Sequence, residues 1–219
     1  MYTKPEYAPL SQDEVFSLIE KTVFATVVTH GPDGLVASHL PFVLKRQESG
    51  GPALVSHLAR ANPQSALIAA GHDTIAIFQG PHGYISSSWY PAQPVRDSAP
   101  TWNFAVVHCH GKPKVLDDHA TARHLLELVE LLEDGRDDRW RMRELGPGGM
   151  ERRMPHILGF SLPASRMEAK FKMGQDERLY DTNAAIAALS GNDPALSDAM
   201  TRHNSSRQPQ AESGVIAPE

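Results

Sequence analysis

The chain has 219 residues, and its 21 Lys and Arg against 26 Asp and Glu give a formal net charge of -5. This acidic balance is a poor match to a protein that must neutralise many DNA phosphates, and it leaves only a local basic patch for such contacts. Cys109 is the single cysteine, which excludes a disulfide within the chain and a four-cysteine zinc site and favours a reducing compartment. The first residues lack the pattern of a signal peptide, and no run of about 18 apolar residues occurs. We therefore expect a soluble, cytoplasmic protein with no membrane partner.

The first half of the chain predicts one helix followed by a series of strands. Ser11 and Glu14 form the S-x-x-E pattern of a helix start, and they predict a helix over about 11–22. Apolar, β-branched segments bounded mostly by Gly, Pro or Asp then predict strands at 24–29, 35–44, 53–58, 74–79, 84–90 and 101–116. The turn segments "GPDG" (31–34) and "ESGG" (48–51) join the first three strands as antiparallel hairpins, which favours a closed or partly closed barrel.

Helices and two late strands complete the expected organisation. Asn62 and Pro63 begin a short helix that Gly71 can end, and a longer helix runs from about residue 117 to Gly135. The remaining pattern predicts strands at about 157–162 and 166–173 and helices near 183–189 and 194–203. We expect one mainly β (α+β) domain over residues 1–203, a barrel with peripheral helices, followed by a disordered polar tail over 204–219.

The segment "SHLARANP" (56–63) is the first candidate for a binding site. Because the first N–H groups of a helix lack an intrahelical partner, the amides around Asn62 and Pro63 are expected to attract an anion. Arg60, just upstream, adds a planar donor suited to phosphate. A surface arginine beside an ordinary helix cap is the alternative interpretation.

Two aromatic segments form the second candidate. In "FQGPHGYISSSWYP" (78–91) we predict a Gly-Pro-His-Gly turn between two strands, the second of which carries hydroxyl groups and rings on one face. The segment "PTWNFAVVHCHG" (100–111) opens with Trp102 and Asn103 before a strand of buried character. Such rings and hydroxyls can hold a planar ring system, and a solvated sheet face is the alternative.

Taken together, these segments resemble the PaiB-like FMN-binding negative transcriptional regulators of bacteria. The segments that carry the resemblance are "GLVASHLPF" (34–42), "HLARANPQ" (57–64), "AIFQGPHGYISSSWY" (76–90), "PTWNFAVVHCHG" (100–111) and "KFKMGQD" (170–176). They occur in this order with similar spacing and span nearly the whole chain up to the tail.

The resemblance implies an FMN-binding split β-barrel of the flavin split-barrel superfamily, usually a homodimer with two cofactors at the subunit interface. It makes Arg60 the expected phosphate ligand, with His57 and Asn62 beside it, and it places Ser38 and His39 near the ribityl chain or the ring edge. The candidates for flanking the isoalloxazine, from the same or the partner subunit, are Gln79, Tyr84, Ser86, Trp102 and Asn103.

The last of these segments departs from the family pattern. Residue 171 is Phe, where the aromatic residue that we expect is often Trp, and residue 174 is Gly, where we expect Ser. Phe104, rather than Tyr, follows Asn103. We therefore assign no cofactor contact to Lys170, Lys172 or Gln175.

A metal site and a nucleophile are the rival interpretations of the histidine-rich strand. His108 and His110 alternate onto one face, and nitrogen ligands suit zinc or iron. Since the sequence identifies no third ligand, we expect a packed or hydrogen-bonded pair and no metal. No histidine of the chain stands out as the axial ligand of a haem. Cys109 lies inside an apolar strand, which predicts a core thiol and not a nucleophile.

The resemblance favours an FMN-binding flavoprotein that acts as a negative transcriptional regulator of the PaiB type. Two alternatives remain, a flavin-dependent oxidoreductase that uses NADH or NADPH on a small molecule and a haem-binding split-barrel protein. No side chain stands out as a catalytic acid or base. DNA is a partner to be tested, since the acidic charge and the lack of a helix-turn-helix pattern disfavour direct DNA contact.

Overall fold

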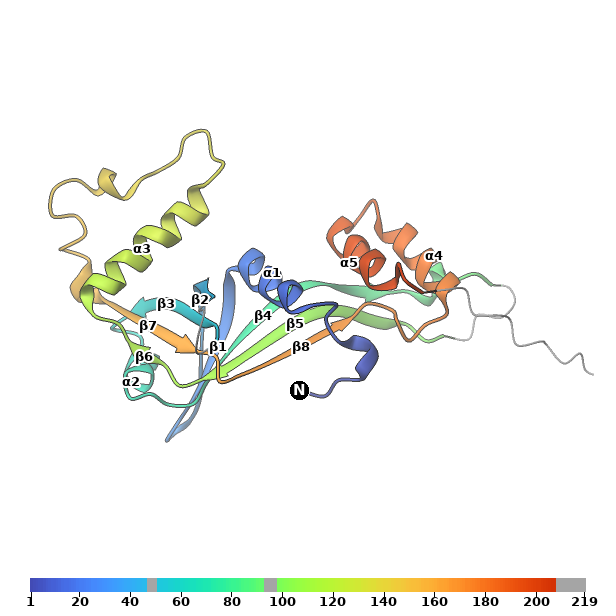
Figure 1. The fold of residues 1–219 in the computed structure, drawn as a ribbon, viewed down its shortest axis with the longest axis horizontal. Coiled ribbons are helices and arrows are strands. Elements are labelled where there is room, and N and C mark those ends of the chain that lie inside the picture. The colour runs from blue at the N-terminus through green and yellow to red at the C-terminus, as the bar shows by residue number, and fades with distance from the viewer. Residues whose placement is uncertain (47–50, 93–97, 208–219) are drawn as a thin grey trace, which may run out of the picture. The chain divides into compact units, whose positions relative to one another are not determined.

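Eight strands lie in the order β6-β7-β3-β2-β1-β4-β5-β8 in the computed structural model (Figure 1), which describes residues 1–46, 51–92 and 98–207. The pairs β1–β2, β1–β4, β2–β3, β3–β7 and β6–β7 are antiparallel. The strands are β1 (Phe24–Gly31), β2 (Gly34–Lys45), β3 (Ala53–Ala59), β4 (Thr74–Ile85), β5 (Thr101–Gly111), β6 (Lys114–Val115), β7 (Ile157–Pro163) and β8 (Arg166–Lys172). The predicted mainly β class is confirmed.

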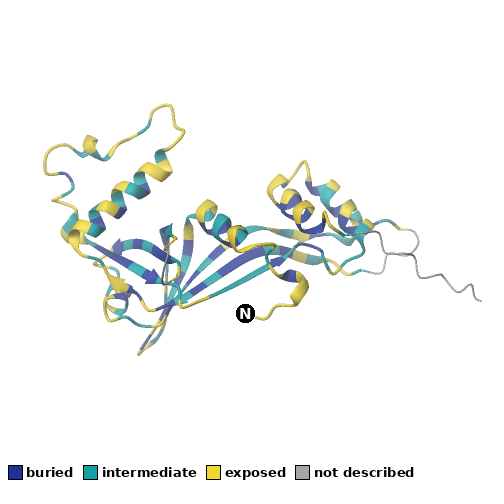
Figure 2. Cartoon of the chain, viewed as in Figure 1, coloured by how far each residue is buried: buried dark blue, intermediate teal, exposed yellow. Residues whose placement is uncertain are grey.

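Five α-helices and several single turns of 3-10 helix accompany the described strands. The α-helices are α1 (Gln12–Thr22), α2 (Gln64–Ala69), α3 (Asp118–Glu133), α4 (Leu179–Leu189) and α5 (Pro194–Asn204). Figure 2 shows a buried and an exposed side along α3, as expected of a helix that packs on a sheet. Within the described ranges, each helix is too short or too polar to cross a lipid bilayer.

The β1–β2 hairpin follows directly from the sequence pattern. Ala25, Val27 and Thr29 are buried, and the residues between them are less so, which is the alternation of a strand with one face on the core. The segment 31–34 forms the predicted turn, with Gly31 opposite Gly34 in the register. Gly34 adopts φ +117°, a conformation that favours glycine.

The Gly-Pro-His-Gly segment forms no turn, so the prediction of two separate strands at 74–79 and 84–90 was wrong. A single strand, β4, runs through it, and residues 87–89 form a 3-10 helix. Gly83 has no positive φ, unlike a turn glycine. Its role is packing, because a Cβ there would lie 2.8 Å from Cδ2 of Leu196 in α5. Extended backbone also suits Pro81, whose ring fixes φ at about -65°.

Smaller differences concern the ends of elements. The strand predicted at 101–116 divides into β5 and β6, and α4 begins at Leu179, four residues before the predicted start at 183. The second predicted turn lies mostly outside the described residues, as does the tail from residue 208 onward.

The chain divides into two compact units. The first unit contains residues 1–12, 79–106 and 169 onward, and the second contains residues 13–78 and 107–168, so that β4, β5 and β8 contribute to both. In the second unit, Phe42 packs edge-on against Phe78 and Phe160, with ring centroids 5.8 and 5.9 Å apart. Leu196 and Met200 of α5 are fully buried in the first unit. The single domain over 1–203 stays a prediction.

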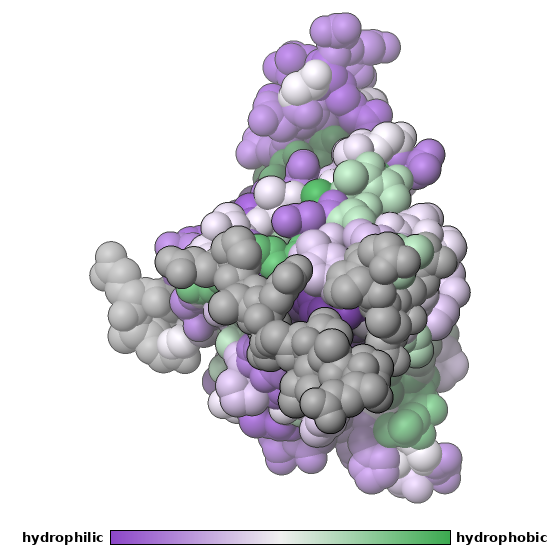
Figure 3. All heavy atoms as spheres, turned by 90° about the vertical axis from the view of Figure 1, so that its right-hand side faces the viewer, coloured by the Kyte–Doolittle hydropathy of each residue, from purple (hydrophilic) through white to green (hydrophobic). Residues whose placement is uncertain are grey.

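Hydrophobic residues on the face drawn in Figure 3 lie in separate groups among hydrophilic ones. This distribution is typical of a surface that faces solvent.

Candidate FMN site

Asn62 and Ser38, predicted from two different segments, are in direct contact in the second unit. Asn62 Nδ2 donates a hydrogen bond of 2.9 Å to Ser38 Oγ. Asn62 lies in the loop that links β3 to α2, and Ser38 lies in the middle of β2 opposite Val27. Both side chains are half-buried, so they offer polar atoms at the surface of the unit.

Arg60 lies one residue beyond β3 and is exposed. Its backbone N–H donates to the His156 carbonyl at 2.9 Å, which fixes the main chain. Within residues 1–46, 51–92 and 98–207, its guanidinium has no hydrogen-bond or ion-pair partner. A planar donor group in this state can accept a phosphate without first losing an internal partner.

The prediction that backbone amides at the start of α2 bind an anion needs correction, because two of these amides already have partners within the chain. The N–H of Gln64 donates to Asn62 Oδ1 at 2.9 Å, and the N–H of Ser65 donates to the Asn62 carbonyl at 2.9 Å. Pro63 has no N–H, and it is the N-cap residue in place of Asn62. Because the chain itself uses these two donors, they are not free for an anion near Arg60.

His57 is engaged elsewhere, on the face of β3 that carries α3. Its Nδ1 lies 3.2 Å from Nε2 of His124, and the two ring centroids are 5.3 Å apart. Burial lowers the pKa of His57, so the ring is neutral near pH 7. Ser56 and Leu58 are buried on the opposite face, as strand alternation predicts. His57 has a packing role in the described structure, and its place beside a phosphate stays a prediction.

His39 lies on the exposed face of the β1–β2 hairpin. Its ring stacks on Phe24, with centroids 6.1 Å apart and planes at 24°. Phe24 is 57% exposed, and Leu35 on the same face is 73% exposed. The hairpin therefore presents an aromatic and aliphatic surface that the second unit does not cover.

Tyr84 and Trp102 come together in the first unit, with ring centroids 6.3 Å apart. His82, which the sequence analysis did not select, stacks on Trp102 at 6.1 Å, and Trp102 Nε1 donates to His82 Nδ1 at 3.4 Å. Residues 82 and 84 alternate onto one face of the single strand β4, a signal that the predicted turn at 80–83 hid from the sequence analysis. Tyr84 and Trp102 are each about half exposed, at 50% and 51%. This cluster can stack on a planar ligand.

The other three predicted ring contacts differ in their surroundings. Gln79 is exposed on β4, and Ser86 Oγ lies 2.7 Å from Ser88 Oγ and accepts from its N–H, so Ser86 caps the 3-10 helix 87–89. Asn103 is only 1% exposed, and its Nδ2 lies 3.6 Å from Met200 Sδ. Its side chain points into the first unit, which makes it a packing residue there.

The segment 170–176 is occupied by contacts within the first unit. The ammonium of Lys170 lies 5.2 to 5.5 Å from the ring centroids of Tyr2, Tyr7 and Phe104. Lys172 Nζ donates to Thr101 Oγ1 at 2.7 Å. These contacts account for both lysines without a cofactor.

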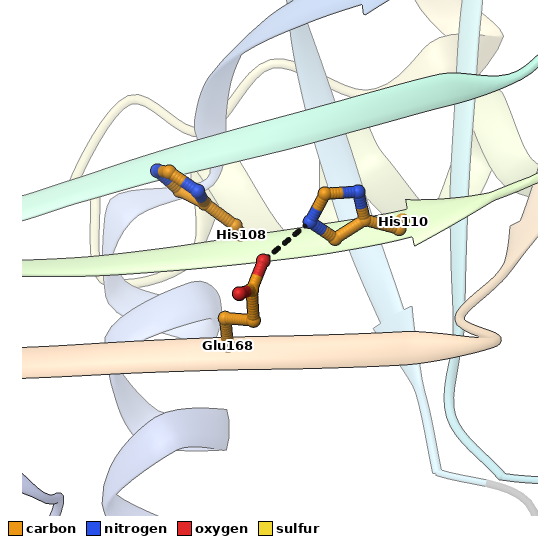
Figure 4. A group of neighbouring side chains, drawn as sticks. All are labelled: His108, His110 and Glu168. Carbon is orange, nitrogen blue, oxygen red and sulfur yellow. Dashed lines mark hydrogen bonds and ion pairs between the residues drawn. The ribbon is translucent and has the colours of Figure 1, made fainter. Parts of the chain in front are cut away.

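His108 and His110 gain a third neighbour in the structure, Glu168 of β8 (Figure 4). His110 Nε2 lies 2.8 Å from Glu168 Oε2. The sequence analysis missed Glu168 because 58 residues separate it from His110, and only the pairing of strands brings them together. Cys109 between the histidines is fully buried, and burial raises its pKa to about 12, which confirms a core thiol.

A cavity of about 640 Å³ lies in the second unit, near the end of β1 and the loop before β4. The residues that line it include His30, Leu35, Asp73, His110, Lys112 and Arg166. None of the ten predicted FMN residues lines it. Arg60 and Asn62, predicted at the phosphate, and Ser38, predicted near the ribityl chain or the ring edge, thus lie outside this cavity.

Comparisons with known proteins place the chain in a family. A family profile described as "Putative FMN-binding domain" matches residues 1–166. Protease synthase and sporulation protein PAI 2 of Bacillus subtilis is 31% identical over 189 residues, which cover 86% of this chain and 89% of that protein. An uncharacterized protein of Saccharomyces cerevisiae, YKL070W, is 33% identical over 110 residues, 49% of this chain and 64% of that protein.

Solved structures support the same fold. The FAD and heme binding protein from Mycobacterium smegmatis has a TM-score of 0.57 at 18% identity, over 82% of this chain and 78% of its own. The flavocytochrome Anf3 from Azotobacter vinelandii also has a TM-score of 0.57 at 18% identity, over 79% and 73%. They confirm the predicted split-barrel fold. Since the profile spans most of the chain and the Bacillus relative aligns over 86% of it, this chain belongs to the FMN-binding domain family, as its sequence motifs predicted.

Proposed function

We propose that the chain binds the phosphate of FMN through Arg60, Asn62 and Ser38 and acts, as a homodimer, as a regulator of the PaiB type. The observation that carries the proposal is the contact between Asn62 and Ser38 beside an arginine whose guanidinium has no partner in the described part of the chain. Bound FMN would supply redox chemistry, and the protein would supply binding and orientation. The cytoplasmic location expected from the sequence belongs to the same proposal.

The chemistry of these side chains suits a phosphate dianion. A guanidinium donates two parallel hydrogen bonds to phosphate oxygens. The amide of Asn62 and the hydroxyl of Ser38 add neutral hydrogen-bond donors. The Tyr84–Trp102 cluster is the group that we expect to flank the isoalloxazine, from either copy of the chain.

A second copy is the partner that we expect at the exposed face of the β1–β2 hairpin. Phe24 and Leu35 there leave more than half of their surface in solvent. An exposed apolar face of this kind favours association. Small-molecule sites usually bury most of their ligand, whereas Arg60 lies on an open surface. Both observations are explained if a second copy covers the hairpin and completes the site.

A regulatory role is favoured over a reductase role by the Bacillus relative, which is named for protease synthesis and sporulation. The formal charge of -5 disfavours a large DNA interface, so regulation would involve a small contact or a protein partner. The Mycobacterium structure is named a heme binding protein and the Azotobacter structure a flavocytochrome, but no histidine in the described ranges is set apart as an axial ligand.

Titration of apo-protein with FMN, followed by flavin fluorescence, tests the phosphate assignment. Arg60→Ala should weaken binding by about 1.5–3 kcal/mol, the range for hydrogen bonds to charged groups. Arg60→Lys keeps the charge but lacks the planar guanidinium, so its FMN affinity should lie between those of the unaltered protein and Arg60→Ala. Arg143→Ala is the matched control, because Arg143 is another exposed arginine far along the sequence. Equal dissociation constants for Arg60→Ala and Arg143→Ala would refute the assignment.

Two assays separate the regulator from the reductase. Salt-dependent gel-shift binding to the DNA upstream of its own gene would support the regulator. Consumption of NADH or NADPH that requires added FMN and persists on a range of small acceptors, without DNA or partner binding, would support the reductase.

Light scattering at several protein concentrations tests the homodimer. The unaltered protein in solution should have twice the 24.0 kDa mass of a single chain. Leu35→Glu should shift it toward the monomer, because a carboxylate in a packed interface is costly. Leu10→Glu is the control, since Leu10 is likewise mostly exposed, at 60%, but lies outside the hairpin. A monomeric unaltered chain would contradict the dimer and leave the test of Arg60 unaffected.

A further inference from the structure

We propose that His108, His110 and Glu168 form a binding site for a divalent transition metal such as Zn²⁺, independent of the flavin site. One nitrogen of each imidazole and one carboxylate oxygen lie within 4.8 Å of one another. Figure 4 shows the two histidines on the same strand, β5, with Glu168 reaching up from the neighbouring strand β8. The three side chains are half-buried, so the group is neither sealed in the core nor fully solvated.

The donor set is the one that such metals prefer. Two imidazoles and one carboxylate bind Zn²⁺ in catalytic sites and Fe²⁺ in non-haem sites, and three protein ligands leave a coordination position open. Two donors bound at about 2.1 Å to one metal lie roughly 3.0–3.4 Å apart. His110 Nε2 and Glu168 Oε2 are already 2.8 Å apart, close to that spacing. His108, whose ring centroid lies 6.4 Å from that of His110, must turn toward the pair.

The charge of the donor set also suits a divalent cation. The carboxylate of Glu168 can balance part of the metal charge, and the two imidazoles can bind through a ring nitrogen. The charged groups that face this cluster include Arg166 and, around the adjoining cavity, His30, Asp73, Lys112 and Lys114.

Arg166 is a cation that contacts two of the three proposed ligands when no metal is bound. Its Nη1 lies 2.8 Å from Glu168 Oε2, and its Nη2 lies 3.2 Å from both ring nitrogens of His110. With 58% of its side chain exposed, Arg166 can swing into solvent. His110 and Arg166 also line the 640 Å³ cavity, which gives an ion a path to the cluster. Arg166 therefore competes with the metal.

Zn²⁺ affinity of the tag-free full chain, measured by competition with a chromophoric chelator, tests the site. His108→Ala, His110→Ala and Glu168→Gln should each weaken Zn²⁺ binding by at least about tenfold, because losing a direct ligand should cost no less than losing an outer-shell partner. Arg166→Ala should tighten it, which a merely structural ion-pair cluster would not do. His119→Ala is the control, since His119 is exposed on α3 and outside the cluster.

Circular dichroism checks that each variant is folded, and Co²⁺ supplies a second measurement on the same chain. A visible absorption spectrum of bound Co²⁺ that the His110→Ala variant loses would support two or more nitrogen ligands. If the three ligand variants bind Zn²⁺ as well as His119→Ala does, or if Arg166→Ala weakens binding, the proposed site is wrong.

Discussion

Asn62 Nδ2 donates a 2.9 Å hydrogen bond to Ser38 Oγ, which ties the loop after β3 to the middle of β2. The same asparagine accepts from the N–H of Gln64 through its Oδ1. One side chain thus orders the start of α2 with its oxygen and presents its amide group next to Ser38. These two roles can be separated by mutation.

Asn62→Asp should weaken FMN binding by more than about tenfold while leaving the fold intact. The carboxylate keeps the acceptor for Gln64 N–H but repels a phosphate and cannot donate to Ser38. Ser38→Ala should cost only about 0.5–1.5 kcal/mol, as for a neutral hydrogen bond. FMN titration at low and high salt measures both, and the effect of Asn62→Asp should shrink as salt rises. Asn192→Asp, at an exposed turn, is the control; a similar loss there would speak against a local phosphate site.

Strand periodicity predicted most of the sheet, and its failures have physical causes. The alternation in β1, β2 and β3 sets their faces and registers, so those strands were found within two residues or so of their ends. Gly83 misled because glycine is needed equally for a turn and for close packing, and only the position of Leu196 decides between them.

The candidate site was harder to predict because contacts between distant segments decide it. Asn103 follows an exposed tryptophan, yet it points into the core toward Met200, a contact across 97 residues. His57 finds its partner on a helix 67 residues away. In contrast, Arg60 and Asn62 belong to one short loop, and the sequence identified both. Local geometry was predictable, and the partners of each side chain were not.

Cys109 should resist thiol reagents in the folded protein. Its side chain is fully buried, and burial raises the pKa of its thiol to about 12, so almost no thiolate exists at pH 8. Labelling with a chromogenic disulfide reagent should be negligible in buffer and reach one thiol per chain in denaturant. The labelling rate should follow the unfolding transition. Fast labelling in buffer would show that β5 opens without global unfolding.

Gly159→Ala should destabilise the second unit by about 1–3 kcal/mol, the usual cost of overpacking. A Cβ at this position of β7 would lie 2.3 Å from Thr121 Oγ1 and 2.8 Å from Thr121 Cγ2, so α3 would have to shift. Thr121→Ala removes both atoms, and the double variant should therefore lose less than the sum of the two single losses. Gly191→Ala is the control, because a Cβ at that position would have no atom within 4 Å. Urea unfolding of the four variants gives the cycle, and strict additivity would contradict this contact.

The His57–His124 pair should make the protein less stable below about pH 6.5. His124 is 2% exposed, and burial, followed by repulsion from His57 and Lys45, lowers its pKa from 6.5 to about 4. The unfolded chain therefore binds this proton near pH 6.5, whereas the folded chain binds it only near pH 4. The free energy of unfolding should thus be unaffected by this group above pH 6.5 and fall by about 2–3 kcal/mol between pH 6.5 and 4.

Urea midpoints at pH 7.5, 6.0 and 5.0 measure this dependence of stability on pH. His124→Gln removes one titrating group and should flatten the decrease, leaving the contributions of His57 and His108, whose pKa values burial also lowers. His119→Ala, which changes an exposed histidine of the same helix, should keep the full decrease. If His124→Gln and His119→Ala lose stability in parallel from pH 7.5 to 5.0, the buried pair is not the cause. A parallel loss would show that groups other than the His57–His124 pair set the dependence of stability on pH.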